Sequence, residues 1–305
     1  MNSTTTMHVR SISLPTRSHP EFYRIDEDLK KVQTWESMAA STTPLKANTI
    51  QIGLVGLAEL YNSFEDVLSL PLTKQALANN HQNKELVDEI LDGSVRLLDI
   101  ISTVKDILAS MKEQVQDLQS AIRRKSSAGE INNKVGAYIC FRKKVKKDIS
   151  KCIVALKRMG NLYCEPSPSL EQDHLSMVVR LLSEVRVITI SIFQHLLSFI
   201  SASKPMKARN GRWALISKLM HKGRVACEGE HESTMSEVEI VDVAIFDAIS
   251  AGKASSKDTE MEKLQAAQKW LEKLENGIEG LEAESEFTFR RLIQSRVSLL
   301  NIFSN

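Results

Sequence analysis

Apolar side chains recur at alternating steps of three and four residues over a long stretch of the chain, from Val87 to Ile122. Only Ser94 places a polar side chain in this series. Such steps keep one stripe of an α-helix facing a partner helix. A helix over 84–125 would be about 60 Å long, at about 1.5 Å of rise per residue. We therefore predict a long helix whose apolar stripe is buried against other helices.

Similar apolar stripes predict further helices near 25–39, 44–68, 131–162, 170–201 and 257–303, with shorter ones near Pro71, 211–221 and 236–250. None of the seven prolines lies within 72–165 or 206–305, and proline breaks helix interiors. Thr43-Pro44 predicts an N-cap followed by a proline at the first helical position. Gly53 and Gly56 lie beside the stripe of the 44–68 helix and predict a close helix contact there.

These stripes predict an all-α protein, an elongated antiparallel bundle of four to six long helices joined by short loops. The helix near 170–201 is apolar on nearly all sides, which indicates a central position. An intermolecular coiled coil is the alternative, but several stripes of similar length favour packing within one chain. We expect a disordered Ser/Thr-rich tail over 1–21 and one helical domain over 22–305, with an irregular basic insertion over 202–256.

Charge is separated by helix, although the net charge of the chain is only +2. Nine basic residues and one acidic residue lie from Lys134 to Arg158, and nine acidic and three basic residues lie from Asp258 to Glu286. Opposite charge predicts that these two helices lie near one another. The small net charge gives no field that favours nucleic acid, and no aromatic residues interleave with the basic ones, so nucleic acid is not an expected partner.

Two basic stretches are candidate contacts for an anionic membrane surface, since clustered lysine and arginine attract acidic lipid headgroups. The alternatives are a nuclear-import patch for the first stretch and, for both, simple packing within the bundle. The candidate residues are Arg142, Lys143, Lys144, Lys146 and Lys147 in the first stretch, and Arg212, Lys218 and Arg224 in the second.

The N-terminal tail contains Arg10-Ser11-Ile12-Ser13-Leu14-Pro15. This is the R-S-x-S-x-P form bound by 14-3-3 adaptors when the second serine is phosphorylated. A phosphate at Ser13 would add a charge of about −1.5 to −2 and three acceptors for an arginine cluster. We expect Ser11 and Ser13 to form a phospho-dependent switch for a protein partner.

No spacing typical of a catalytic or metal site occurs, so we expect no enzyme activity, no catalytic or metal-ligating residues and no cofactor. The four cysteines form no C-x-x-C pair, and Cys152 occupies a position in the apolar stripe of its helix. The most apolar run, Val187–Ile200, is shorter than the roughly 20 residues that span a bilayer. We expect a cytoplasmic protein that is not secreted, with peripheral membrane contact as the alternative.

Several segments, taken in order along nearly the whole chain, resemble the plant-specific BYPASS family of proteins of unknown function. The resemblance implies a regulatory role in root and shoot development and in restraining a root-derived mobile signal. It supplies no catalytic residues. The segments are His8–Pro15 with His19-Pro20, Leu70–Leu77, Leu91–Asp99, Tyr138 with Arg142–Lys144, Arg224–Glu228 and Phe289–Ile302.

Overall fold

The computed structural model describes residues 19–78, 84–161, 174–202, 235–251 and 257–304. Every element in these residues is an α-helix, and the predicted all-α class is confirmed. The helices are α1 (Pro20–Ser41), α2 (Ala47–Ser69), α3 (Pro71–Ala78), α4 (Lys84–Arg123), α5 (Ala128–Asn161), α6 (His174–Ser201), α8 (Glu237–Ala251) and α9 (Lys257–Ser304).

The stripe predicted from periodicity forms the buried side of α4. Its middle is at most 2% exposed, and its partners are other helices of the same chain, in agreement with the preferred prediction of packing within one chain. Because the apolar side chains lie on one face of α4, packing removes them from water, while the other face of the helix stays polar. The buried members are Leu97, Ile101, Val104, Leu108, Met111, Val115 and Leu118.

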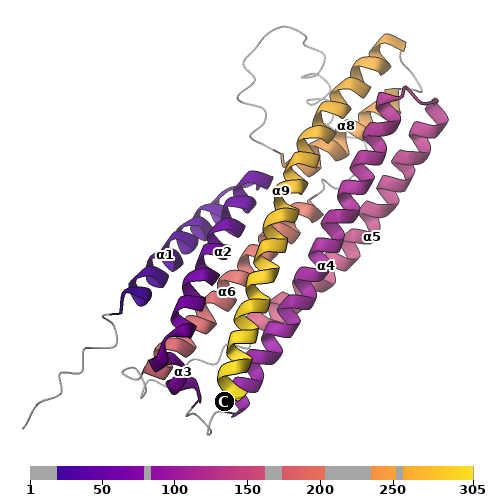
Figure 1. Ribbon diagram of the computed structural model, residues 1–305. Coiled ribbons are helices and arrows are strands. Elements are labelled where there is room, and N and C mark those ends of the chain that lie inside the picture. The colour runs from indigo at the N-terminus through magenta and orange to yellow at the C-terminus, as the bar shows by residue number, and fades with distance from the viewer. Residues whose placement is uncertain (1–18, 79–83, 162–173, 203–234, 252–256, 305) are drawn as a thin grey trace, which may run out of the picture.

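Four helices, α2, α4, α6 and α9, surround the middle of the elongated bundle (Figure 1). The 48-residue α9 packs against α2, α3, α4 and α8. On the other side of the core, α6 packs against α1, α2, α3, α4 and α5, which confirms its predicted central position. The helix α1 covers α2 and α6, and α5 covers α4 and α6.

The consecutive pairs α1–α2, α4–α5 and α5–α6 run antiparallel, as predicted, but two pairs of helices far apart in sequence run parallel. In the first pair, Phe22 meets His174 and Trp35 meets His195, so α1 and α6 point the same way. In the second pair, α2 and α9 point the same way, since a Cβ at Gly277 would meet Ala47 while Ser298 donates to Glu65 further along both helices.

The contact between α1 and α2 confirms the prediction from Gly53 and Gly56. A Cβ at Gly53 would lie 2.4 Å from the indole ring of Trp35, and one at Gly56 would lie 3.2 Å from Val32. The start of α2 was predicted wrongly. The helix begins at Ala47 with Lys46 as N-cap, so Thr43-Pro44 precedes the helix and does not cap it.

The acidic side of α9 faces α4, and the prediction that it would pair with α5 is not what the structure shows. Lys112 of α4 contacts Glu282 at 2.8 Å and Glu279 at 3.8 Å, and Lys105 pairs with Glu286. The α4 helix packs between α9 and α5 (Figure 1). The charge pattern therefore indicated correctly that α9 contacts a basic partner, but the partner is α4 and not α5.

Cys152 is 8% exposed within the core, as its stripe position predicted, and burial is the main cause that raises the pKa of its thiol.

In the part of the chain that the structure describes, no helix has the length and apolar character needed to cross a bilayer.

Candidate functional site: the junction of α5, α6 and α8

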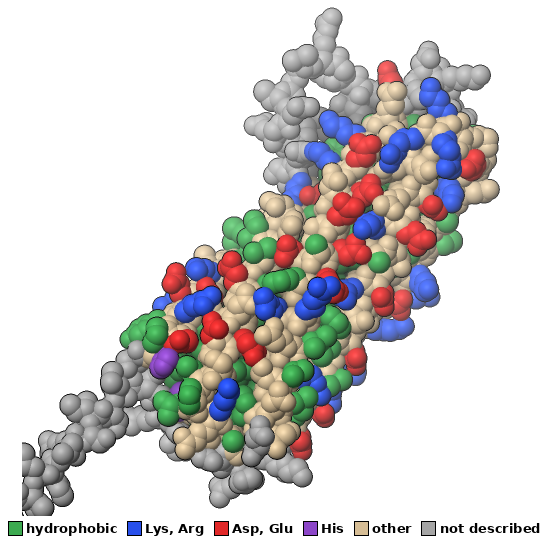
Figure 2. All heavy atoms as spheres, in the orientation of Figure 1, with side chains coloured by type: hydrophobic (Ala, Val, Ile, Leu, Met, Phe, Trp, Pro, Cys, Tyr) green, Lys and Arg blue, Asp and Glu red, His purple; other side chains and the backbone are tan. Residues whose placement is uncertain are grey.

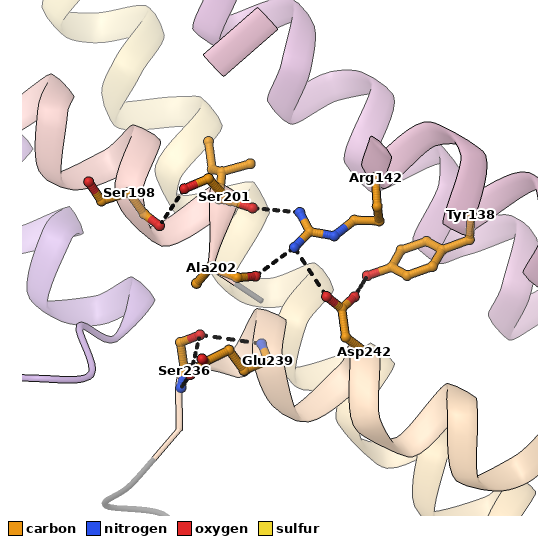
Figure 3. A network of polar contacts seen from close by, with 9 residues as sticks. Tyr138, Arg142, Ser198, Ser201, Ala202, Ser236, Glu239 and Asp242 are labelled. Atoms are coloured by element: carbon orange, nitrogen blue, oxygen red, sulfur yellow. Dashed lines mark hydrogen bonds and ion pairs between the residues drawn. The ribbon is translucent and has the colours of Figure 1, made fainter. Parts of the chain in front are cut away.

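A buried arginine joins three helices at one place in the bundle (Figure 3). Arg142 belongs to α5 and is only 5% exposed. Its Nη1 donates to the backbone carbonyl of Ile200 at 2.5 Å, and its Nη2 donates to that of Ala202 at 2.7 Å. Both carbonyls lie at the carboxyl end of α6, where helix dipoles favour a positive charge. The guanidinium therefore caps α6.

Asp242 of α8 completes this junction. One carboxylate oxygen accepts from Arg142 Nη2 at 3.2 Å, and the other accepts from the Tyr138 hydroxyl at 2.8 Å. The carboxylate thus binds two side chains that lie one turn apart on α5 (Figure 3). Since a charge in a mostly buried place is costly unless it is paired, these contacts favour a single position of α8 against α5.

Burial is the main cause that raises the pKa of Tyr138 well above its ordinary value, and the negative charge of Asp242 adds to the shift while Arg142 opposes it. The phenol therefore stays protonated and remains a hydrogen-bond donor. Burial also lowers the pKa of the nearby Lys146 ammonium, with a further contribution from the positive charge of Arg142.

The start of α8 is fixed locally by its own sequence. Ser236 Oγ accepts from the backbone N–H of Glu239 at 3.3 Å, and Glu239 Oε2 accepts from the backbone N–H of Ser236 at 3.1 Å. This reciprocal pair is a capping box, which satisfies two amide groups that a helix start leaves unpaired. The S-x-x-E spacing is visible in the sequence and agrees with the helix predicted near 236–250.

Of the five basic candidates in the first stretch, the structure removes Arg142 from the surface. Arg142 was predicted to contact an anionic surface, and this is wrong because its guanidinium is buried on α6 and Asp242. Lys143, Lys144 and Lys147 are exposed, and Lys146 is half-buried. We call the three exposed side chains the lysine face of α5.

The other predicted residues fall outside the described part of the chain. These are the basic candidates of the second stretch and the two tail serines, namely Arg212, Lys218, Arg224, Ser11 and Ser13.

The three lysines of this face make no direct ion pair within the part of the chain that the structure describes. The nearby Asp148 carboxylate bonds directly to Lys151 at 2.9 Å, which is the main cause that lowers its pKa, and the charges of Lys144 and Lys147 lower this pKa further. Elsewhere, Figure 2 shows acidic and basic side chains interspersed over the visible face. Within the residues that the structure describes, no group of three His, Cys, Asp or Glu side chains gathers as a metal site would require.

Sequence reasoning missed Asp242, although a signal for it existed. Asp242 stands in the otherwise apolar stretch Ile240–Ile245. A carboxylate on a buried helix needs a cationic or hydrogen-bonding partner, so its presence there indicates a polar contact between helices. The partner itself cannot be read from the sequence, because Arg142 is 100 residues away.

The fold and the junction define an all-helical bundle protein whose buried polar contacts join helices distant in sequence. Residues 53–302 match the family model described as Protein BPS1. The chain belongs to this family, and the resemblance to BYPASS-related proteins is confirmed. Searches of curated proteins and of solved structures found no match to the chain.

Proposed function

We propose that this chain is a non-enzymatic regulatory or scaffold protein that acts in root and shoot development of plants through protein partners. Family membership supports the regulatory class. The observation that supports a binding mode is the lysine face of α5. Its three cations are exposed and make no direct ion pair among the described residues, and the junction holds the helix in place. Such a face attracts an acidic partner surface.

The test is complementation of a plant that lacks this protein. We expect the triple variant Lys143→Glu, Lys144→Glu, Lys147→Glu to fail to restore root and shoot growth, because reversed charge repels an acidic partner. A matched triple on other surfaces, Lys30→Glu, Lys74→Glu, Lys269→Glu, should restore growth like the unchanged protein. These three lysines are also exposed and lie on α1, α3 and α9.

Both triples must accumulate to the same level and show the same helical circular dichroism for the comparison to count. Full restoration of growth by the α5 triple would contradict the proposed role of the lysine face. If the α5 triple fails to restore growth, purification with the unchanged chain and the α5 triple as baits identifies the bound proteins that depend on this face.

A second candidate function is peripheral binding to an anionic membrane, for which the same lysine face supplies the charges. Binding through such charges weakens with salt, since the screening length falls from about 10 Å at 0.1 M to about 3 Å at 1 M. The protein should therefore pellet with vesicles rich in phosphatidylserine at low salt and be released at high salt. A protein that stays in the supernatant at low salt rules this candidate out.

The tail motif supplies one proposed protein partner, a phosphoserine-binding adaptor at Ser13. We expect Ser13→Ala to abolish adaptor capture from plant extract, while Ser11→Ala serves as the neighbouring control because the phosphate belongs on the second serine. Equal capture by the unchanged chain and Ser13→Ala would remove this partner from the proposal.

A further inference from the structure

A cavity lies among the four central helices, away from the lysine face. Its volume is about 70 Å³, and side chains from α2, α4, α6 and α9 line it. Most of the lining is apolar, including the rings of Tyr61 and Phe64 and the side chain of Leu299. One buried water needs about 10–15 Å³ of such space, so the cavity holds a few waters or a short organic group.

Arginine side chains reach this apolar space from two sides. Arg296 of α9 donates through Nη1 to the carbonyl of Leu91 and to Ser94 Oγ, the latter at 2.5 Å. The rest of its guanidinium fork makes no hydrogen bond, and no carboxylate pairs with it within the described residues. Arg296 therefore places a positive charge at the cavity and has further N–H donors that can bind a ligand.

Arg186 of α6 is the second cation. Its Nη2 donates to the carbonyl of Met159 at 3.0 Å, and its closest carboxylate, Glu89, lies 3.8 Å from Nη1 and is partly exposed. A Cβ at Gly93 would lie 3.4 Å from this guanidinium, so Arg186 packs directly against α4 at this position. Burial is the main cause that lowers the pKa of Arg186, and the positive charge of Arg96 lowers it further.

A buried hydroxyl group adds a donor to the same wall. Ser295 lines the cavity, and the residue is only 3% exposed. A serine hydroxyl can donate one hydrogen bond, so Ser295 can serve a ligand in the cavity. Ser295 and Arg296 also belong to the segment Phe289–Ile302, and Ser94 to Leu91–Asp99, so two segments that carry the family resemblance meet here.

We propose that this cavity binds a short aliphatic carboxylate, with the carboxylate on Arg296 and Ser295 and the alkyl group among the apolar side chains. The guanidinium fork matches the two oxygens of a carboxylate, and the apolar lining disfavours a fully hydrated anion such as free phosphate. The small volume limits the alkyl group to a few carbons. This site is independent of the proposed function, because the lysine face lies on another helix.

Titration calorimetry of the full chain with butyrate tests the site, with butan-1-ol and butylamine as probes of equal length. We expect saturable binding of butyrate in the millimolar range or tighter, and at least tenfold weaker binding of the alcohol and the amine. Arg296→Gln should weaken butyrate binding at least tenfold. Arg290→Gln, an exposed arginine on the same helix, should leave it unchanged.

A second variant keeps the test decisive if Arg296→Gln fails to fold. Ser183 is half-buried and lines the cavity, so Ser183→Leu should fill the space and abolish butyrate binding while the helical fold is kept. The proposal is overturned if butyrate shows no saturable binding, if butan-1-ol binds as tightly as butyrate, or if a folded Ser183→Leu binds butyrate like the unchanged chain.

Discussion

Gly53 lies under the indole ring of Trp35, whose Nε1 donates to the carbonyl of Thr49 at 2.7 Å. The ring is therefore held by a hydrogen bond and cannot move aside freely. We expect Gly53→Ala to destabilise the protein by about 1–3 kcal/mol through overpacking, despite the better helix propensity of alanine. Urea unfolding followed by circular dichroism measures the change.

Gly136 is the matched control for this substitution. It also lies inside a long helix, but a Cβ there would meet nothing within 4 Å. Gly136→Ala should stabilise the protein by about 0.5–1 kcal/mol, because alanine loses less backbone entropy on folding. Equal effects of the two substitutions would mean that the contact of Trp35 with Gly53 is not close.

Tyr61 makes stability depend on alkaline pH. Its hydroxyl lies 3.0 Å from that of Thr189, and burial raises the pKa of Tyr61 to about 12. An unfolded tyrosine loses its proton near pH 10, while the folded one keeps it. Stability from this group is therefore complete below about pH 10 and is lost as the pH rises towards 12, by about 1.4 kcal/mol per pH unit.

The variant Tyr61→Phe separates this effect from the titration of lysines. We expect it to lower the unfolding free energy at neutral pH by about 1 kcal/mol through the lost hydrogen bond. Between pH 10 and 12 its stability should fall less steeply than that of the unchanged chain. Parallel declines in the two proteins would show that the Tyr61 phenol is not buried in solution.

At the scale of elements, α8 depends on one carboxylate for its place on α5. Asp242→Ala leaves the buried Arg142 without its counter-charge and Tyr138 without its acceptor. We expect the free energy of local opening of α8 to fall by about 2 kcal/mol. Amide hydrogen exchange in Glu237–Ala251 should then accelerate by roughly 30-fold.

Asp247 on the same helix is the control. Burial is the main cause that raises the pKa of its carboxyl group, so its charge is not stabilised where it lies. Asp247→Ala should leave exchange in α8 unchanged or slower. Similar acceleration in both variants would mean that any loss of charge loosens this helix, and that the contact with Arg142 is not what positions it.

Among the described residues, the existence of each helix could be predicted from the sequence, because periodicity and proline placement act within one element; the helix predicted near 211–221 lies outside these residues. The pairing of helices could not. The stripes of α4, α5 and α9 are similar in spacing, so apolar pattern alone does not decide which of them meet. The paired side chains Arg142 and Asp242, or Arg296 and Ser94, lie too far apart in sequence for a local pattern to join them.

The whole molecule should behave as a rod in solution. The 48 residues of α9 alone span about 72 Å, at about 1.5 Å per residue. A compact globule of 305 residues would have a radius of gyration of about 19 Å. Small-angle X-ray scattering should give a larger radius and a longest dimension above about 70 Å. The same measurement on a chain without residues 1–18 excludes the tail as the cause, and a radius near that of the globule would contradict the rod.

The position of α9 late in the chain has a consequence for biosynthesis. Its partners α2 and α4 leave the ribosome well before it, and translation of the residues between them takes on the order of tens of seconds at about 5–20 residues per second. Through that interval the nascent chain exposes the apolar sides of two long helices. Chaperones that recognise such surfaces should therefore associate with polysomes making this protein until α9 emerges.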